Sequence, residues 1–122
     1  MGEQVGALKI ALTALDTAGG VLSVANPEGV ALIVTDLVLD VTTVATAVCT
    51  VDAGIAANGT TLNDTLIDGA DVHTATGAFG SPSGSDGVPA VKWGTTQYLT
   101  ASVATGAAAG LVGYAYIKYI RV

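Results

Sequence analysis

The sequence contains little positive charge, and this scarcity is the first guide to its function. Its 122 residues include 4 Lys and Arg residues against 10 Asp and Glu residues, for a formal net charge of −6. Nucleic-acid binding needs clustered basic residues that displace counterions from phosphates, and attraction to an anionic membrane needs the same cluster. Four scattered basic residues therefore predict no direct contact with nucleic acid and none with a membrane surface.

Side chains that carry catalysis are also scarce. The chain has one Cys, Cys49, and one His, His73. A single Cys cannot form an intrachain disulfide, and the strand pattern around Cys49 predicts a buried thiol. A serine triad would have to combine His73 with Ser81, Ser83 or Ser85, which lie in a segment without a nucleophile elbow. No P-loop or dinucleotide fingerprint occurs either. We therefore expect no enzyme activity and no cofactor.

The acidic residues offer one candidate for a cation. Asp64, Asp68 and Asp71 precede His73, and closely spaced carboxylates on a loop are typical ligands of calcium. Their spacing matches no EF-hand loop, and zinc needs more ligands than one His and a distant Cys. Solvated carboxylates at turns are the favoured interpretation. We expect no metal site, and cation binding at residues 64–71 stays open.

Long apolar runs and targeting signals are missing as well. The longest uncharged apolar stretch, residues 101–117, contains spread glycines and falls short of the roughly 20 residues of a membrane helix. Residues 1–6 lack the basic and apolar regions of a signal peptide. These features predict a protein that is made in a cytoplasm. Residues 1–7 could form a flexible arm that ties subunits together.

The composition is rich in small apolar residues. Hydrophobic residues make up 51% of the chain and charged residues 11%. A domain of this size with so few charges is expected to cover part of its surface with other protein, and a symmetric oligomer is the natural form. A monomer with a surface of Thr, Ser and Gly is the alternative.

The pattern of apolar residues predicts an all-β fold. Extended segments recur about every ten residues, and no segment shows a convincing helical period. We expect a single antiparallel β-sandwich, jelly-roll-like, over residues 1–122, with a long exposed Gly/Ser loop at 77–89. Residues 30–41 carry apolar side chains on both faces, which predicts a strand between two layers or under a neighbouring subunit. The other strands are expected at residues 7–15, 21–25, 46–53, 93–103 and 111–122. Residues 62–67 are expected to form a short strand or a helical turn, and residues 72–75 a short extended piece.

The last thirty residues hold the tryptophan and all four tyrosines. Residues 93–103 and 111–122 flank Gly106 and Gly110, which predicts a β-hairpin. Tyr and Trp fill cores and also anchor interfaces, and an aromatic shelf for sugars is a third interpretation. Strand parity places three tyrosines together in the core and turns the fourth toward a neighbouring chain. The candidate interface residues are Trp93, Tyr98, Tyr114, Tyr116 and Tyr119, with Tyr119 as the one facing the neighbour.

Several segments resemble a known group of virion proteins. The run from Cys49 to Ile55, the turn Asn58-Gly59-Thr60, the run from Thr65 to Gly69 and the closing run from Gly110 to Ile120 are similar to head decoration (cement) and related capsid accessory proteins of tailed bacteriophages. The chain departs from one such group by lacking a Pro/Thr-rich N-terminal arm.

The resemblance implies a homotrimer on the capsid surface of the virion. Such a protein would be assembled in the host cytoplasm, bind the outer shell and clamp adjacent subunits of the major capsid protein. Two alternatives stay open. One is a tail, collar or head-fibre component, and the other is a carbohydrate-binding β-sandwich module whose site would use the 77–89 loop and Trp93.

Overall fold

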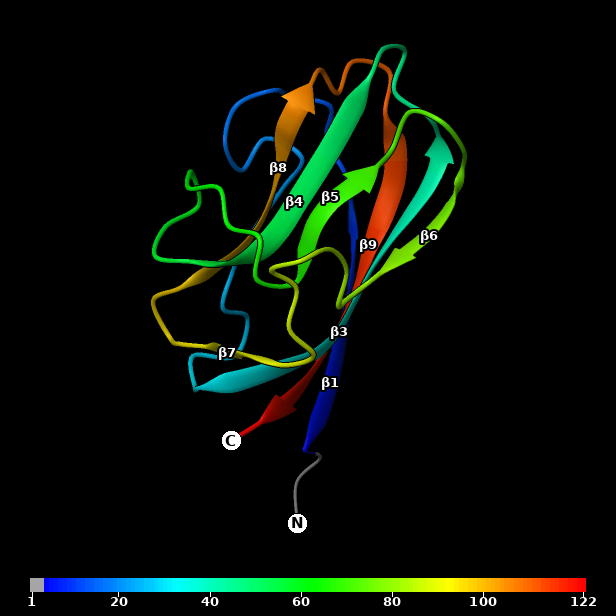
Figure 1. Ribbon diagram of the computed structural model, residues 1–122. Helices are drawn as coiled ribbons and strands as arrows, with labels where there is room; N and C mark the ends of the chain where they lie inside the picture. Colours follow the sequence, from blue (N-terminus) through cyan, green and yellow to red (C-terminus); the bar gives the residue numbers. More distant parts are fainter. Residues whose placement is uncertain (1–3) are drawn as a thin grey trace.

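Two antiparallel sheets make up the computed structural model, which describes residues 4–122 (Figure 1). One sheet contains β1 (Val5–Ala11), β9 (Val112–Arg121), β3 (Leu32–Thr43) and β6 (Gly77–Gly80) in that order, and β7 (Val91–Trp93) pairs with the start of β3. The other contains β2 (Leu22–Ala25), β8 (Tyr98–Gly106), β4 (Cys49–Ala56) and β5 (Ile67–Asp71) in that order. The predicted all-β, antiparallel sandwich is confirmed. No helix in the described residues is long and apolar enough to cross a membrane.

The core lies between the two sheets and is filled by one face of each strand. Along β9, buried and exposed residues alternate strictly, because successive side chains point to opposite faces of a strand. The strand thus contributes Ala115, Ile117 and Tyr119 to the core and presents its other side chains outward. Cys49 is fully buried in the same core, as predicted. The largest fully buried side chains include Trp93, Leu32, Leu37, Leu39, Leu66, Ile67, Leu99 and Ile117.

The structure of β3 shows why apolar residues occur at both even and odd positions of this strand. A register shift against β9 lies between Val34 and Asp36, and an extra residue in a strand reverses the direction of the side chains that follow. Val34 therefore points into the core at an even number, whereas Leu37 and Leu39 point inward at odd numbers. A β-bulge therefore accounts for the apolar residues of both parities, and within the described chain only the inner face of β3 lies against a second layer. Covering of its outer face by a neighbouring subunit stays a prediction.

The predicted C-terminal hairpin was also wrong. Strands β8 and β9 lie in different sheets and do not pair with each other. Gly106 and Gly110 have positive φ angles of 83° and 84°, as turn glycines do, but the segment between them is an arch from one sheet to the other. Ala108 in this arch is fully buried, and its N–H donates a hydrogen bond to Asp16 Oδ1 over 2.7 Å. Turn chemistry thus identified the reversal but not the partner strand.

Two further segments differ from expectation. Within residues 77–89, Gly77–Gly80 forms strand β6 beside β3, so the segment is an exposed loop only after residue 80. Ser81 ties that loop to β3, since its Oγ accepts a 2.9 Å hydrogen bond from the Leu37 N–H. Of the expected arm at residues 1–7, Val5 and the two residues after it belong to β1, and residues 1–3 lie outside the described part of the chain.

Candidate interaction surface

The outer face of the β1-β9-β3-β6 sheet is exposed along the described chain. Cross-strand register aligns the outward side chains of β9 with those of β1 and β3 in level rows. We call this surface the open face. Its main side chains are Val5, Ala7, Lys9, Ala11, Ile33, Asp36, Val38, Asp40, Tyr114, Tyr116, Lys118 and Ile120.

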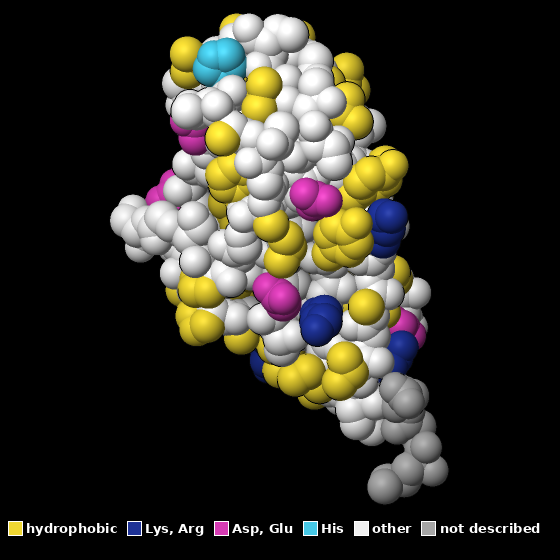
Figure 2. Space-filling model, turned by 90° about the vertical axis from the view of Figure 1, so that its right-hand side faces the viewer, with side chains coloured by type: hydrophobic (Ala, Val, Ile, Leu, Met, Phe, Trp, Pro, Cys, Tyr) yellow, Lys and Arg dark blue, Asp and Glu magenta, His cyan; other side chains and the backbone are white. Residues whose placement is uncertain are grey.

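Large apolar side chains gather on the open face. Val5 is 57% exposed, Tyr114 37%, Tyr116 39% and Ile120 38%, and all four lie on the neighbouring strands β1 and β9. Figure 2, seen from the side of β6 and β9 in Figure 1, shows hydrophobic side chains interspersed with isolated Lys or Arg and Asp or Glu side chains. Exposed aromatic and aliphatic side chains with charged groups among them are found at protein interaction sites.

The lysines of the chain are all on this side of the molecule. Lys9 and Lys118 lie on the open face, and Lys92 on β7 pairs with Ile33 at its margin. The ammonium group of Lys9 lies 4.6 Å from the centre of the Tyr114 ring and 5.7 Å from that of Tyr116, within the range of a cation–π contact. Among residues 4–122 no lysine forms an ion pair, because the salt bridge found there joins Arg121 to Glu28. These charges are therefore available to a partner.

The outer face of the other sheet is covered by the chain's own loops, and we call it the covered face. The Thr100 hydroxyl donates to the Thr61 carbonyl over 2.8 Å, and the Gly19 N–H donates to Ser102 Oγ over 2.8 Å. Gly54 on β4 has no side chain where a Cβ would collide with Asn63, so the loop lies directly on the strand. The outward side chains of β8 are therefore hydrogen-bonded to loops of the same chain, whereas the outward side chains of the open face are exposed to solvent.

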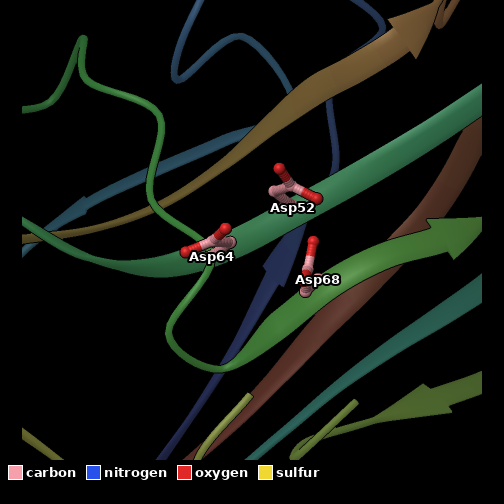
Figure 3. A group of neighbouring side chains, drawn as sticks. All are labelled: Asp52, Asp64 and Asp68. Atoms are coloured by element: carbon pink, nitrogen blue, oxygen red, sulfur yellow. The ribbon is translucent and has the colours of Figure 1, made fainter. Parts of the chain in front are cut away.

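Three carboxylates meet on the covered side (Figure 3). Asp52 comes from β4, Asp64 from the loop before β5, and Asp68 from β5, and one oxygen of each lies within 4.8 Å of the others. The Gly69 N–H donates to Asp52 Oδ1 over 2.8 Å, and the Ser85 hydroxyl donates to Asp68 Oδ2 over 3.1 Å. Such an oxygen set is chemically suited to a hard cation such as calcium.

Burial and like charge act together on this cluster. Burial raises the pKa of Asp52, and the charges of Asp68 and Asp86 raise it further, against the hydrogen bond from Gly69 that lowers it. Burial also raises the pKa of Asp64, and a hydrogen bond with the Asp86 carboxyl adds to this. Ionised carboxylates at this distance repel one another, so the cluster opposes folding at neutral pH.

The structure separates the other two members of the predicted acidic region from this cluster. Asp71 accepts hydrogen bonds from the backbone N–H groups of His73 and Thr74, and its bond with the Thr74 hydroxyl is the main reason that its pKa is lowered. His73 Nδ1 lies 2.7 Å from the Ala45 carbonyl oxygen. Asp52, which the sequence did not suggest, takes their place in the cluster.

The tyrosine assignment in the sequence analysis was inverted. Tyr114 and Tyr116 point to solvent, whereas Tyr119 is 2% exposed and packs edge-on against Trp93, with ring centres 6.4 Å apart. A Cβ on Gly6, directly opposite in β1, would collide with the Tyr119 ring, so this glycine makes room for it. Tyr98 is half-buried on the covered face.

Trp93 cannot form a sugar platform. Its side chain is fully buried, and its indole N–H donates to the Gln97 carbonyl over 2.9 Å. The carbohydrate-binding alternative relied on this ring and on the 77–89 loop, part of which is strand β6. The open face therefore retains two of the five candidate interface residues, Tyr114 and Tyr116.

The hydroxyl of Tyr119 is hydrogen-bonded to a carboxylate that also forms an ion pair. Its hydroxyl donates to Glu28 Oε2 over 2.6 Å, and the same oxygen lies 2.8 Å from Arg121 Nη2. The hydrogen bond from Arg121, followed by the one from Tyr119, lowers the pKa of Glu28. Burial and the neighbouring Glu28 carboxylate raise the pKa of Tyr119. This network links the loop after β2 to the end of β9.

Comparison with known proteins gives one fold relative. No protein-family model matches the chain, and no curated protein matches it. A chain of the solved structure "Capsid of Ralstonia phage GP4" is 19% identical, and the alignment covers 100% of this chain and 87% of that one with a TM-score of 0.66. The two chains therefore share a fold over the whole length of the present sequence.

Proposed function

We propose that this chain is a virion structural protein of a bacteriophage. In this proposal it is a jelly-roll-like decoration protein that binds the outer surface of the capsid as a homotrimer and stabilises adjacent subunits of the major capsid protein. The observation that carries the proposal is the full-length likeness of fold to a chain of a phage capsid structure. The role is structural, without catalysis, and the protein acts on the capsid after assembly in the host cytoplasm.

The open face and the low charge of the chain support a protein that works by contact. A ligand that binds an assembled shell but not its separated subunits stabilises the shell by mass action, about 2.7 kcal/mol per site at a concentration 100 times Kd. A trimer that bridges several subunits adds avidity to each contact. Many weak contacts of this kind strengthen a shell without any cofactor.

The direct test uses empty shells assembled from the major capsid protein encoded in the same genome. Purified protein is added at micromolar concentration, free protein is removed, and the temperature of shell disruption is measured. We expect co-sedimentation with the shells and a higher disruption temperature. Absence of binding at micromolar protein would refute the decoration role, and binding to purified tails instead would favour a tail, collar or head-fibre component.

A further inference from the structure

The open face divides into two halves of different character along its midline. That midline lies between β9 and β3, the two central strands in the order β1-β9-β3-β6. The β9 half carries aromatic and basic side chains, whereas the β3 half carries acidic and aliphatic ones. In register order the facing pairs are Tyr114 with Asp40, Tyr116 with Val38, Lys118 with Asp36, and Ile120 with Ile33.

We propose that the open face packs against further copies of the same chain about an axis parallel to its strands. Rotation about such an axis keeps each residue at its own level along the strand. It brings the β9 half of one copy against the β3 half of the next. Lys118 of one copy then meets Asp36 of the next, and Tyr116 meets Val38 at the adjacent level.

The chemistry of these pairs favours this axis over the alternative. Lys118 meets a carboxylate of the next copy in addition to the Asp36 that lies opposite it in its own chain, and the Tyr114 hydroxyl gains Asp40 as an acceptor. Both carboxylates of the open face thus have polar partners across the contact. An in-plane axis across the strands would instead place Asp36 against Val38 and Asp40 against Ile33. Burying carboxylates against aliphatic side chains without partners is costly. The face is self-complementary in one orientation.

Charge distribution supports a second copy as the occupant. Each chain carries a net charge of −6, so copies repel one another over most of their surfaces. The open face is the exception, because Lys9 and Lys118 balance Asp36 and Asp40 there. The carboxylate cluster lies on the opposite sheet and would point away from the contact.

The two halves differ, so the contact is heterologous and closes into a ring when the rotation permits it. The number of copies rests on the proposed function, which calls for three. Three open faces would then surround the axis, with the covered faces outward.

The test is charge reversal followed by molar-mass measurement across a range of concentrations. We expect the wild type at a mass three times the 12.0 kDa of one chain. Lys118→Asp and Asp36→Lys should each raise the dissociation concentration at least about tenfold, since like charges then face each other at every contact. The double variant K118D/D36K should restore the trimer because the pair is only exchanged. Asp86→Lys makes the same charge change as Asp36→Lys on the covered side and should leave the mass unchanged.

The outcomes separate this inference from the proposed function. Circular dichroism of each variant must show the wild-type fold before its mass is compared. A wild type that stays monomeric, a mass other than three chains, or single reversals that leave the trimer intact would each overturn the inference. If the protein binds shells but does not form this trimer, the inference fails and the decoration role is retained. If the trimer responds to the charge exchange as expected but does not bind shells, the inference is retained and the decoration role fails.

Discussion

The two outer faces of this sandwich differ in what covers them. On the covered face, loops lie on the sheet and hydrogen-bond to Thr100 and Ser102. On the open face, Tyr114 and Tyr116 stand more than a third exposed beside Lys9. Both faces belong to sheets with a common core, so stability alone does not require the difference. A face that the chain leaves bare while it covers the other is available to a partner.

The charges follow the same division. The lysines lie on or beside the open face, and the cluster of Asp52, Asp64 and Asp68 lies on the covered side. The open face also carries Asp36 and Asp40, so it has mixed charge, whereas the cluster on the covered side is negative. Such an asymmetry orients a protein as it approaches a partner. The covered side is the one expected to face solvent in an assembly.

The largest effect on the stability of the fold should come from truncating a side chain on the buried side of β9. Ile117→Ala removes a fully buried side chain and should lower the free energy of unfolding by about 2–5 kcal/mol. Tyr116→Ala, one residue away on the open face, should change it by only about 0.5 kcal/mol. Urea unfolding at concentrations where each protein is monomeric measures both. Similar losses in the two variants would mean that Tyr116 belongs to the core.

A second effect, smaller than the first, concerns the tyrosine that faces inward. Tyr119→Phe keeps the ring against Trp93 but removes the 2.6 Å hydrogen bond to Glu28. We expect the midpoint of thermal unfolding to fall by several degrees, because a buried phenol bonded to a carboxylate is strongly stabilised. Tyr114→Phe on the open face is the matched control and should leave the midpoint nearly unchanged. An equal fall in both would remove the distinction between the faces.

The stabilisation by Glu28 should depend on pH. Its pKa in the folded protein is lowered from 4.5, so the ionised form is favoured by folding. The contribution is therefore present above pH 4.5 and is lost as the pH falls through the lower, folded-state pKa. We expect Glu28→Gln to destabilise the folded protein at pH 7. It should have no effect at a pH low enough for Glu28 to be protonated in both the folded and the unfolded protein. Thermal unfolding of the two proteins between pH 7 and pH 2 measures this, and a difference that persists at the acid end would contradict it.

The smallest effect should come from the carboxylate cluster, and its sign is opposite. The pKa of Asp52 is raised, so ionisation opposes folding and the penalty disappears as the pH falls through the folded-state pKa. Asp52→Asn retains an acceptor for the Gly69 N–H and should raise the unfolding midpoint by a few degrees at pH 7 but not at pH 3. Calcium titration of the wild type is the companion measurement. Destabilisation by Asp52→Asn at pH 7 in metal-free buffer would show that the negative charge of Asp52 does not oppose folding.

Sequence patterns predicted the sandwich because alternation and turn glycines are local properties. Pairing is not local, and for this reason the reversal at Gly106 and Gly110 was assigned to a hairpin instead of an arch between sheets. Parity along β9 was read correctly, but the inward position of Tyr119 relies on room that Gly6 leaves on the opposite strand, a contact between residues far apart in the sequence. The register shift after Val34 is not marked by a turn residue, so it could not be predicted from the sequence. The open face could therefore be predicted as an aromatic cluster but not placed.

A cryo-EM reconstruction of shells incubated with this protein would show directly how the open face is used. We expect density for three sandwiches around each axis, with the open faces turned toward that axis and the carboxylate side toward solvent. Sandwiches bound singly, or bound with Tyr114 and Tyr116 directed to solvent, would contradict it.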